Sequence, residues 1–289
     1  LVDVASWNGR AVAVTTQRGD DSRARVWVQD WQAGLSVWLE VEAPASLDKF
    51  PGRGVSMQVI GDTLHLLGGV DSDESALGVH ITYDLKKGQR SAFGSGAWHR
   101  RLGADARAFA VLSQTEGDLL AVGGLAGFYV KAGAKDKDNA ERVLHRQFKA
   151  EVNERMSWKK RDSAPEDVSG AHSVSNNRSV VIGPGQKSNG KVFIYDASNA
   201  WYMLPDLPKE VGMGQVFLED QTLTYAGGFN KDGSPSKDIY TLDLSDLRGE
   251  WKHAGTSDYV AGKARIVESN GHLMSLMVKP DASAMFYLD

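Results

Sequence analysis

The residues best suited to chemistry in this chain are its seven histidines, because imidazole binds metals and transfers protons near neutral pH. No two of them form an H-x-H or HExxH motif, and none has carboxylates at the spacing of a metal site. Three could still converge in space from distant loops. The pattern nevertheless predicts no metal site, and the histidines are His65, His80, His99, His145, His172, His253 and His272.

Other catalytic signatures are also missing from the sequence. The chain has no cysteine, which excludes disulfides, thiolate metal sites and cysteine nucleophiles. It contains neither a G-x-S-x-G nucleophile elbow nor a phosphate-binding G-x4-G-K-[ST] loop. Grouped carboxylates such as Asp20-Asp21 stand in polar loops, where they are typical turn formers. We therefore expect no catalytic residues, no cofactor and a protein that is not an enzyme.

The charge balance argues against two classes of partner. The 289 residues include 33 Lys and Arg against 37 Asp and Glu, a formal net charge of −4. Nucleic acids and anionic membranes normally require a basic patch. The chain has no run of 18 apolar residues, and its first ten residues do not resemble a signal peptide. We expect no nucleic-acid partner, no membrane insertion, a cytoplasmic location and a monomeric domain of a larger protein.

The elements that would position any site recur along the chain. Each repeat has two short apolar runs joined by a turn, and the second run ends in paired glycines. A third run ending in Asp follows a polar loop, and a tryptophan opens a fourth. This order predicts four antiparallel strands. The glycine-ended runs are Leu64 to Gly69, Leu119 to Gly124 and Leu223 to Gly228, with Val180 to Gly185 as a variant; the third runs are Ile81 to Asp84, Phe193 to Asp196 and Tyr240 to Asp243; the tryptophans are Trp98, Trp158, Trp201 and Trp251.

Six such copies of about 48 residues each account for the chain, which is the length of a propeller blade. The sequence predicts an all-β, six-bladed propeller with four-stranded antiparallel blades, as one domain over residues 1–289. The last copy supplies three strands, so we expect a three-stranded blade or a fourth strand from outside this chain or from Leu1 to Trp7. The third strand of the third copy is expected at Leu144 to Phe148. Helix is expected at most around Lys135 to Arg142, where a mobile charged loop is favoured.

The paired glycines and tryptophans resemble those of kelch-repeat propellers. The resemblance covers almost the whole chain, although Thr15-Thr16, Gly183-Pro184-Gly185 and Ser275-Leu276 depart from the glycine pair. A WD40 propeller is the alternative, but its GH and WD pairs are missing. The resemblance implies that these glycines and tryptophans are architectural. It also implies a peptide-capturing face, with Arg53 and Arg107 before first strands.

Loops on a rigid scaffold are where binding normally occurs. The loops between second and third strands and those between repeats emerge on the same face, and the latter are basic. Arginine's planar fork suits carboxylates, so we expect an acidic protein or peptide partner, although pairing with loop carboxylates is an alternative. The long Leu125 to Arg142 loop adds two aromatic residues. The predicted partner-binding residues are Arg53, Arg100, Arg101, Arg107, Arg161, Phe128 and Tyr129; Lys49, Lys160, Lys263 and Arg265 belong to the same basic loops.

The sequence thus favours a non-catalytic protein-interaction module, of the ligase-adaptor or scaffold type. Two alternatives remain open. One is a small-molecule enzyme of the sugar epimerase or cyclase type, with its site in the central channel; a closed polar pocket with a converging carboxylate and histidine would support it. The other, implied by the family resemblance, is an actin-binding cytoskeletal scaffold.

Overall fold

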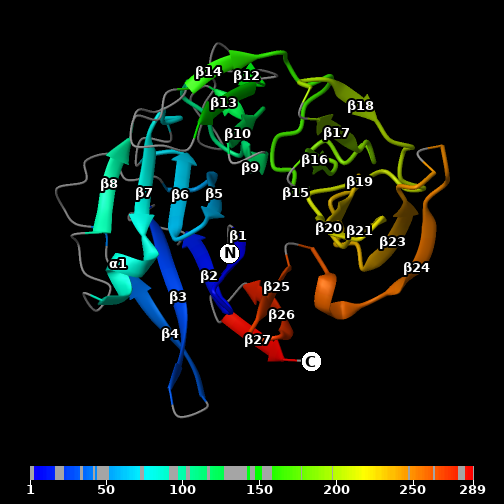
Figure 1. The fold of residues 1–289 in the computed structure, drawn as a ribbon. Coiled ribbons are helices and arrows are strands. Elements are labelled where there is room, and N and C mark those ends of the chain that lie inside the picture. Colours follow the sequence, from blue (N-terminus) through cyan, green and yellow to red (C-terminus); the bar gives the residue numbers. More distant parts are fainter. Residues whose placement is uncertain are drawn as a thin grey trace, which may run out of the picture.

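The described part of the chain is almost entirely β-structure. A computed structural model describes residues 3–16, 23–32, 35–41, 43, 52–71, 75–90, 97–101, 105–115, 118–126, 142–143, 147–151, 158–176, 178–196, 198–246, 248–262, 264–278 and 284–288. These residues form small antiparallel sheets, numbered here from sheet 1 to sheet 6 in chain order, that are arranged radially (Figure 1). This arrangement confirms the prediction of an all-β propeller.

Each sheet begins with a strand near the centre and proceeds outward (Figure 1). Five sheets have four strands, and sheet 6 has three. Two short ribbons lie outside them: β11 (Leu125–Ala126) with β12 (Arg142–Val143), and β19 (Val211–Gly212) with β22 (Phe229–Asn230). The sheets are β1 (Asp3–Trp7), β2 (Arg10–Thr16), β3 (Ala24–Gln32) and β4 (Leu35–Val41); β5 (Val55–Ile60), β6 (Thr63–Gly68), β7 (His80–Asp84) and β8 (Trp98–Arg101); β9 (Val111–Thr115), β10 (Asp118–Val122), β13 (Gln147–Glu151) and β14 (Trp158–Arg161); β15 (Ser173–Ser175), β16 (Ser179–Ile182), β17 (Phe193–Asp196) and β18 (Trp201–Met203); β20 (Gln215–Glu219), β21 (Thr222–Ala226), β23 (Asp238–Asp243) and β24 (Lys252–Thr256); and β25 (Arg265–Ser269), β26 (His272–Val278) and β27 (Ala284–Leu288).

The first strands follow one another around the centre. β1 contacts both β5 and β25, β9 contacts both β5 and β15, and β15 contacts β20. The Gln215 side chain joins β20 to β25, because its amide donates to the Ile266 carbonyl (2.8 Å) and accepts from the Ile266 N–H (2.6 Å). The first strands therefore form a continuous wall around a central channel.

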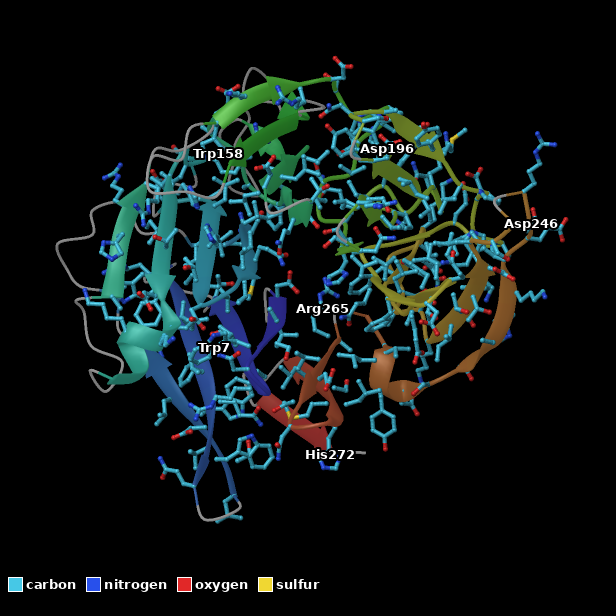
Figure 2. All side chains as sticks on the ribbon, in the orientation of Figure 1. Trp7, Trp158, Asp196, Asp246, Arg265 and His272 are labelled. Atoms are coloured by element: carbon cyan, nitrogen blue, oxygen red, sulfur yellow. The ribbon has the colours of Figure 1, made fainter. Side chains whose placement is uncertain are left out.

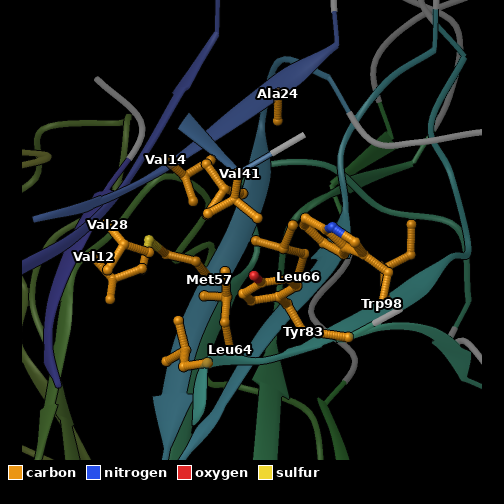
Figure 3. Packing of buried hydrophobic residues seen from close by; sticks show 14 of the residues in the cluster. Val12, Val14, Ala24, Val28, Val41, Met57, Leu64, Leu66, Tyr83 and Trp98 are labelled. Atoms are coloured by element: carbon orange, nitrogen blue, oxygen red, sulfur yellow. The ribbon is translucent and has the colours of Figure 1, made fainter. Parts of the chain in front are cut away.

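The hydrophobic core lies between neighbouring sheets. The cluster shown in Figure 3 joins Val12, Val14 and Val28 of sheet 1 to Met57 and Leu66 of sheet 2. The consecutive residues Ala11 to Val14 of β2 are all buried, because successive side chains point to opposite faces and sheet 1 packs against a neighbouring sheet on each side. Further clusters lie between sheets 2 and 3, 3 and 4, 4 and 5, and 6 and 1.

The paired glycines are architectural, as the repeat pattern predicts. Gly227 has a φ of +71°, and an added methyl group would overlap the carbonyl oxygen of Val260. Gly68, with a φ of +69°, stands in the same relation to the carbonyl oxygen of Arg107. Only glycine combines this left-handed backbone with so close an approach of a neighbouring chain segment.

Tryptophans open β8, β14 and β18, as expected, whereas Trp251 lies one residue before β24. The Trp251 indole donates to the Pro205 carbonyl at 2.7 Å, which ties sheet 5 to the loop that precedes it. The ring of Trp98 packs on Tyr83 with centroids 4.7 Å apart. A buried indole that also satisfies its N–H is well suited to the space between sheets.

Two details differ from expectation, and one alternative for the last repeat is excluded. Helix α1 (Leu85–Arg90) was not predicted, because it is short and contains a glycine; the Asp84 carboxylate accepts the Lys87 N–H at 2.7 Å and stabilises its first turn. The third strand of sheet 3 is Gln147–Glu151, later than predicted, since Gln147 pairs with Val122. β1 pairs with β2 and is the first strand of sheet 1, so it does not complete sheet 6.

Gly227→Ala should unfold at much lower denaturant concentration than wild type. The expected loss is on the order of 3 kcal/mol or more, because both the backbone conformation and the space are unsuitable. Gly271→Ala is the matched control, since Gly271 has a φ of +78° but no atom near the added methyl group. It should lose only about 1 kcal/mol. Equal losses in urea unfolding would contradict the close-approach explanation.

Candidate functional site

The channel contains a cavity of about 560 Å³. Its walls come from β1, β5, β9, β15, β20 and β25 and from the residues just before these strands. Its volume lies within the usual range of small-molecule sites. In Figure 2 the labelled Arg265 lies beside the centre of the ring, whereas His272 and Asp246 lie at its periphery.

Three ionisable side chains converge in this cavity: Asp3, His172 and Arg265. The Asp3 Oδ1 atom lies 3.8 Å from His172 Nε2 and 3.6 Å from Arg265 Nε. It also accepts the Val4 N–H at 2.9 Å. The side chains of Arg265 and His172 are 9% and 14% exposed, while that of Asp3 keeps 28% exposure.

The Asp3–His172 contact spans the channel. β1 lies between β25 and β5, whereas the strand that follows His172, β15, lies between β9 and β20. These two strands are not neighbours in the wall, so the two side chains meet across the space that the wall encloses. The central cavity is therefore interrupted by side chains at the end where the first strands begin.

Burial favours the uncharged forms of two of these groups. It lowers the pKa of His172 to about 3, and the nearby Arg265 guanidinium lowers it further in the same direction. The imidazole is therefore neutral near pH 7. Its Nδ1 lies 3.4 Å from the Val216 N–H and can accept from it, which assigns the proton to Nε2, facing Asp3. Burial also raises the pKa of Asp3, although Arg265 and the Val4 N–H oppose this effect.

Two atoms of the cluster are left for a ligand. Within the described residues, every contact of the Asp3 carboxylate involves Oδ1, and Oδ2 has no partner. Arg265 donates through Nη1 to the Ala264 carbonyl at 3.1 Å, and its buried Nε has no hydrogen-bond acceptor within the described chain. Such an arrangement can exchange a proton at Oδ2 and stabilise negative charge beside Arg265.

The predicted partner-binding residues that the structure describes do not form one surface. Arg53 is exposed and lines the cavity, just before β5. Arg100 is exposed and Arg101 half-buried on the outer strand β8, and Arg161 is exposed at the end of the outer strand β14. Phe128 and Tyr129 lie outside the described residues, as do Lys49 and Lys263.

Arg107 is fully buried, which argues against contact with a partner. Its guanidinium Nη1 donates to the Gly123 carbonyl at 3.1 Å, and its main-chain oxygen accepts the Gly69 N–H at 2.9 Å. Arg107 therefore joins the glycine pairs of sheets 2 and 3. The sequence showed its position before a first strand but not its direction, because a buried arginine and an exposed one look alike in a polar loop.

Sequence reasoning missed the cluster. It named His172 and Arg265 separately and did not consider Asp3, because they stand far apart in the chain. One signal was available: all three occur at or just before a predicted first strand. The other described histidines lie elsewhere, with His65 and His80 buried side by side in sheet 2 (Nδ1 to Nε2, 3.1 Å) and His99, His253 and His272 exposed.

Comparison with known proteins bears on the fold. The structure of YjhT aligns with a TM-score of 0.73 and 17% sequence identity, over 99% of this chain and 93% of that one. The two share a fold. At this identity the likeness extends no further. No family model and no curated protein sequence matches the chain.

Two features are not found among the described residues. In that part of the chain no group of three or more His, Asp or Glu side chains is placed to hold a metal ion. None of the helices described there has the length and apolar character needed to cross a bilayer.

His172 should make the protein acid-sensitive. A histidine whose folded pKa is depressed stabilises the fold above its unfolded pKa of 6.5, and this stability is lost as pH falls toward about 3. Buried His65, with a pKa of about 4, acts with the same sign. Asp3 has the opposite effect on stability. Because its pKa is raised in the folded protein, its contribution favours the fold below the unfolded pKa of 3.8 and is lost as the pH rises.

His172→Gln should therefore weaken the pH dependence of unfolding free energy between pH 6.5 and 4. One titrating proton contributes up to about 1.4 kcal/mol per pH unit. His272→Gln, at an exposed position on β26, is the control and should keep the wild-type slope. Urea unfolding at a series of pH values measures both, and equal slopes for the two variants would refute the assignment.

Proposed function

We propose that the channel binds a small polar molecule and catalyses a proton-transfer isomerisation of it, of the sugar epimerase or cyclase type. The observation that supports this most is the unpaired Asp3 Oδ2 within a cavity of about 560 Å³, beside His172 and Arg265. A converging carboxylate and histidine in a polar pocket is what separates this function from an interaction module.

Each member of the cluster has a distinct role in this proposal. Asp3 transfers the proton through Oδ2, and its raised pKa brings the carboxyl closer to the pH at which it can both accept and donate. His172 is a positioning residue, since its two nitrogens face Val216 N–H and Asp3 Oδ1. Arg265 stabilises negative charge that develops on the ligand oxygen. Arg53, at the same end of the cavity, attracts anionic groups.

Asp3→Asn should reduce turnover at least about a hundredfold, because an amide cannot exchange the proton. A panel of aldoses in D2O, followed by ¹H NMR, reports both anomer interconversion and deuterium uptake at carbon. Glu219→Gln changes an exposed carboxylate at the end of β20 and should retain full activity. If Asp3→Asn keeps wild-type rates on every substrate that wild type converts, the role of Asp3 is wrong.

A second proposal retains the interaction module, on a different surface. The outer strands β8 and β14 belong to adjacent sheets, and both continue their tryptophan with basic residues. Arg100, Lys159 and Arg161 are exposed there. A basic perimeter of this kind would bind an acidic peptide. No described contact favours the cytoskeletal alternative.

The double variant Arg100→Glu with Arg161→Glu should bind a deca-glutamate peptide at least about fivefold more weakly than wild type, with a smaller salt dependence. Fluorescence anisotropy of the labelled peptide gives both quantities. The double variant Arg248→Glu with Lys252→Glu, at exposed positions on and shortly before the outer strand β24 of sheet 5, supplies the same charge change elsewhere and should have little effect. Equal losses of peptide affinity in the two proteins would show that the net charge of the protein, and not the surface of β8 and β14, determines binding.

We also propose that sheets 1 to 6 are the blades of a six-bladed, kelch-type propeller forming one domain, in a cytoplasmic protein. Glycine pairs at close approach and tryptophans at outer strands support the kelch assignment. The absence of cysteine is compatible with the compartment.

A further inference from the structure

Two bulky residues have an unusual backbone conformation. Seven non-glycine residues in the described chain have positive φ, and five of these are Asn, Asp or Ser, types that tolerate it. The remaining two are Phe109 (φ +56°) and Met213 (φ +59°). A large side chain persists in this conformation only where its surroundings impose it, and such residues cluster at ligand sites.

Both residues line the channel cavity. Phe109 lies two residues before β9, and Met213 lies two residues before β20, so they share the end of the channel that contains Asp3 and Arg265. Both are partly exposed. Their backbones are held in place, because Phe109 N–H donates to the Gly54 carbonyl at 2.6 Å and Met213 N–H donates to the Pro184 carbonyl at 2.8 Å.

The corresponding position in sheet 2 is a glycine. The pairing of the first and second strands can be extended by one or two residues beyond the strand ends. Phe109 then lies opposite Gly124 and Met213 opposite Gly228, the second glycines of their pairs. Gly54 lies opposite Gly69 in the same way. Gly54 has the same left-handed backbone, with a φ of +73°, and glycine adopts it without strain. The fold therefore does not need a side chain at this position, and its presence in sheets 3 and 5 requires another explanation.

The Phe109 ring is supported from behind. A methyl group added to Gly54 would lie 2.9 Å from Phe109 Cε2, so the ring rests directly on the Gly54 backbone. A methyl group added to Gly170 would lie 3.6 Å from the Met213 sulfur, so this thioether lies beside the Gly170 backbone at ordinary contact distance. A flat aromatic ring and an adaptable thioether thus flank the end of the cavity that also contains Asp3, His172 and Arg265.

We propose that Phe109 and Met213 form an apolar wall that packs against the C–H face of a pyranose ring, while the hydroxyl groups of that sugar reach Asp3 and Arg265. This inference rests on the proposed function and specifies its substrate class. A pyranose ring combines polar edges with an apolar face, which matches a cavity that presents both kinds of surface at one end.

Methyl β-D-glucopyranoside and methyl β-D-galactopyranoside are suitable probes, because a methyl glycoside cannot open and so reports binding independently of turnover. Saturation-transfer NMR on the wild-type protein should mark the axial ring protons most strongly. Phe109→Gly and Met213→Gly should each weaken binding about tenfold, as expected for loss of an apolar contact. Their thermal midpoints should be no lower than those of Phe109→Ala and Met213→Ala, since glycine relieves the backbone strain.

Asp220→Gly is the matched control: Asp220 has a φ of +51°, but it is exposed in the turn between β20 and β21. It should bind both probes as wild type does. If Phe109→Gly does not fold, Phe109→Leu tests the same contact and should weaken binding by a smaller factor. Affinities within twofold of wild type, or no saturation transfer to the wild-type protein, would overturn the inference. Normal binding of the two probes together with wild-type turnover by Asp3→Asn would instead contradict only the proposed catalysis.

Discussion

The close approach between the end of a second strand and the start of the next repeat is the constraint on which this structure depends. The sheets converge toward the channel, where a second strand must leave its sheet within contact distance of the next repeat. At Gly68 the neighbouring atom is the Arg107 carbonyl oxygen, and at Gly227 it is that of Val260. No residue with a Cβ combines the two requirements of left-handed backbone and space. The positions of all channel-lining side chains follow from this convergence.

The same constraint explains how the chain joins its ends. Sheet 6 does not share a strand with sheet 1; side chains and turns connect them instead. The Asn270 N–H donates to the Gly9 carbonyl at 2.8 Å, and the Ser269 hydroxyl donates to the same carbonyl at 3.2 Å. On the other side, Gln215 fastens β25 to β20. With both neighbours fixed, Arg265 is held beside Asp3, although 261 positions separate them in the numbering.

The sequence was informative about strands and nearly silent about the site. Apolar runs, turns and paired glycines are local features, so the strand order of a repeat could be predicted, and the missed helix α1 is too short to show a periodicity. Asp3 and His172 are different. Their meeting depends on how far the ring turns between one repeat and the next, and no local pattern encodes that angle. Arg107 was misjudged for the same reason, since only the packed neighbour shows that its guanidinium binds the Gly123 carbonyl.

This chain contains an ion pair whose charged forms are stabilised and a buried cluster, in the channel, whose charged forms are disfavoured. At Asp238 the Lys209 ammonium, 2.6 Å away, lowers the pKa of the carboxylate, and the charged form is stabilised. At Asp3 burial raises the pKa and outweighs the opposing effect of Arg265, whereas at His172 burial and the Arg265 guanidinium both lower the pKa, to about 3. A cluster whose charged forms are disfavoured contributes little as an ion pair, and apolar side chains could fill the same space at least as well. The stability of the fold therefore does not account for this cluster, whereas the proposed function does.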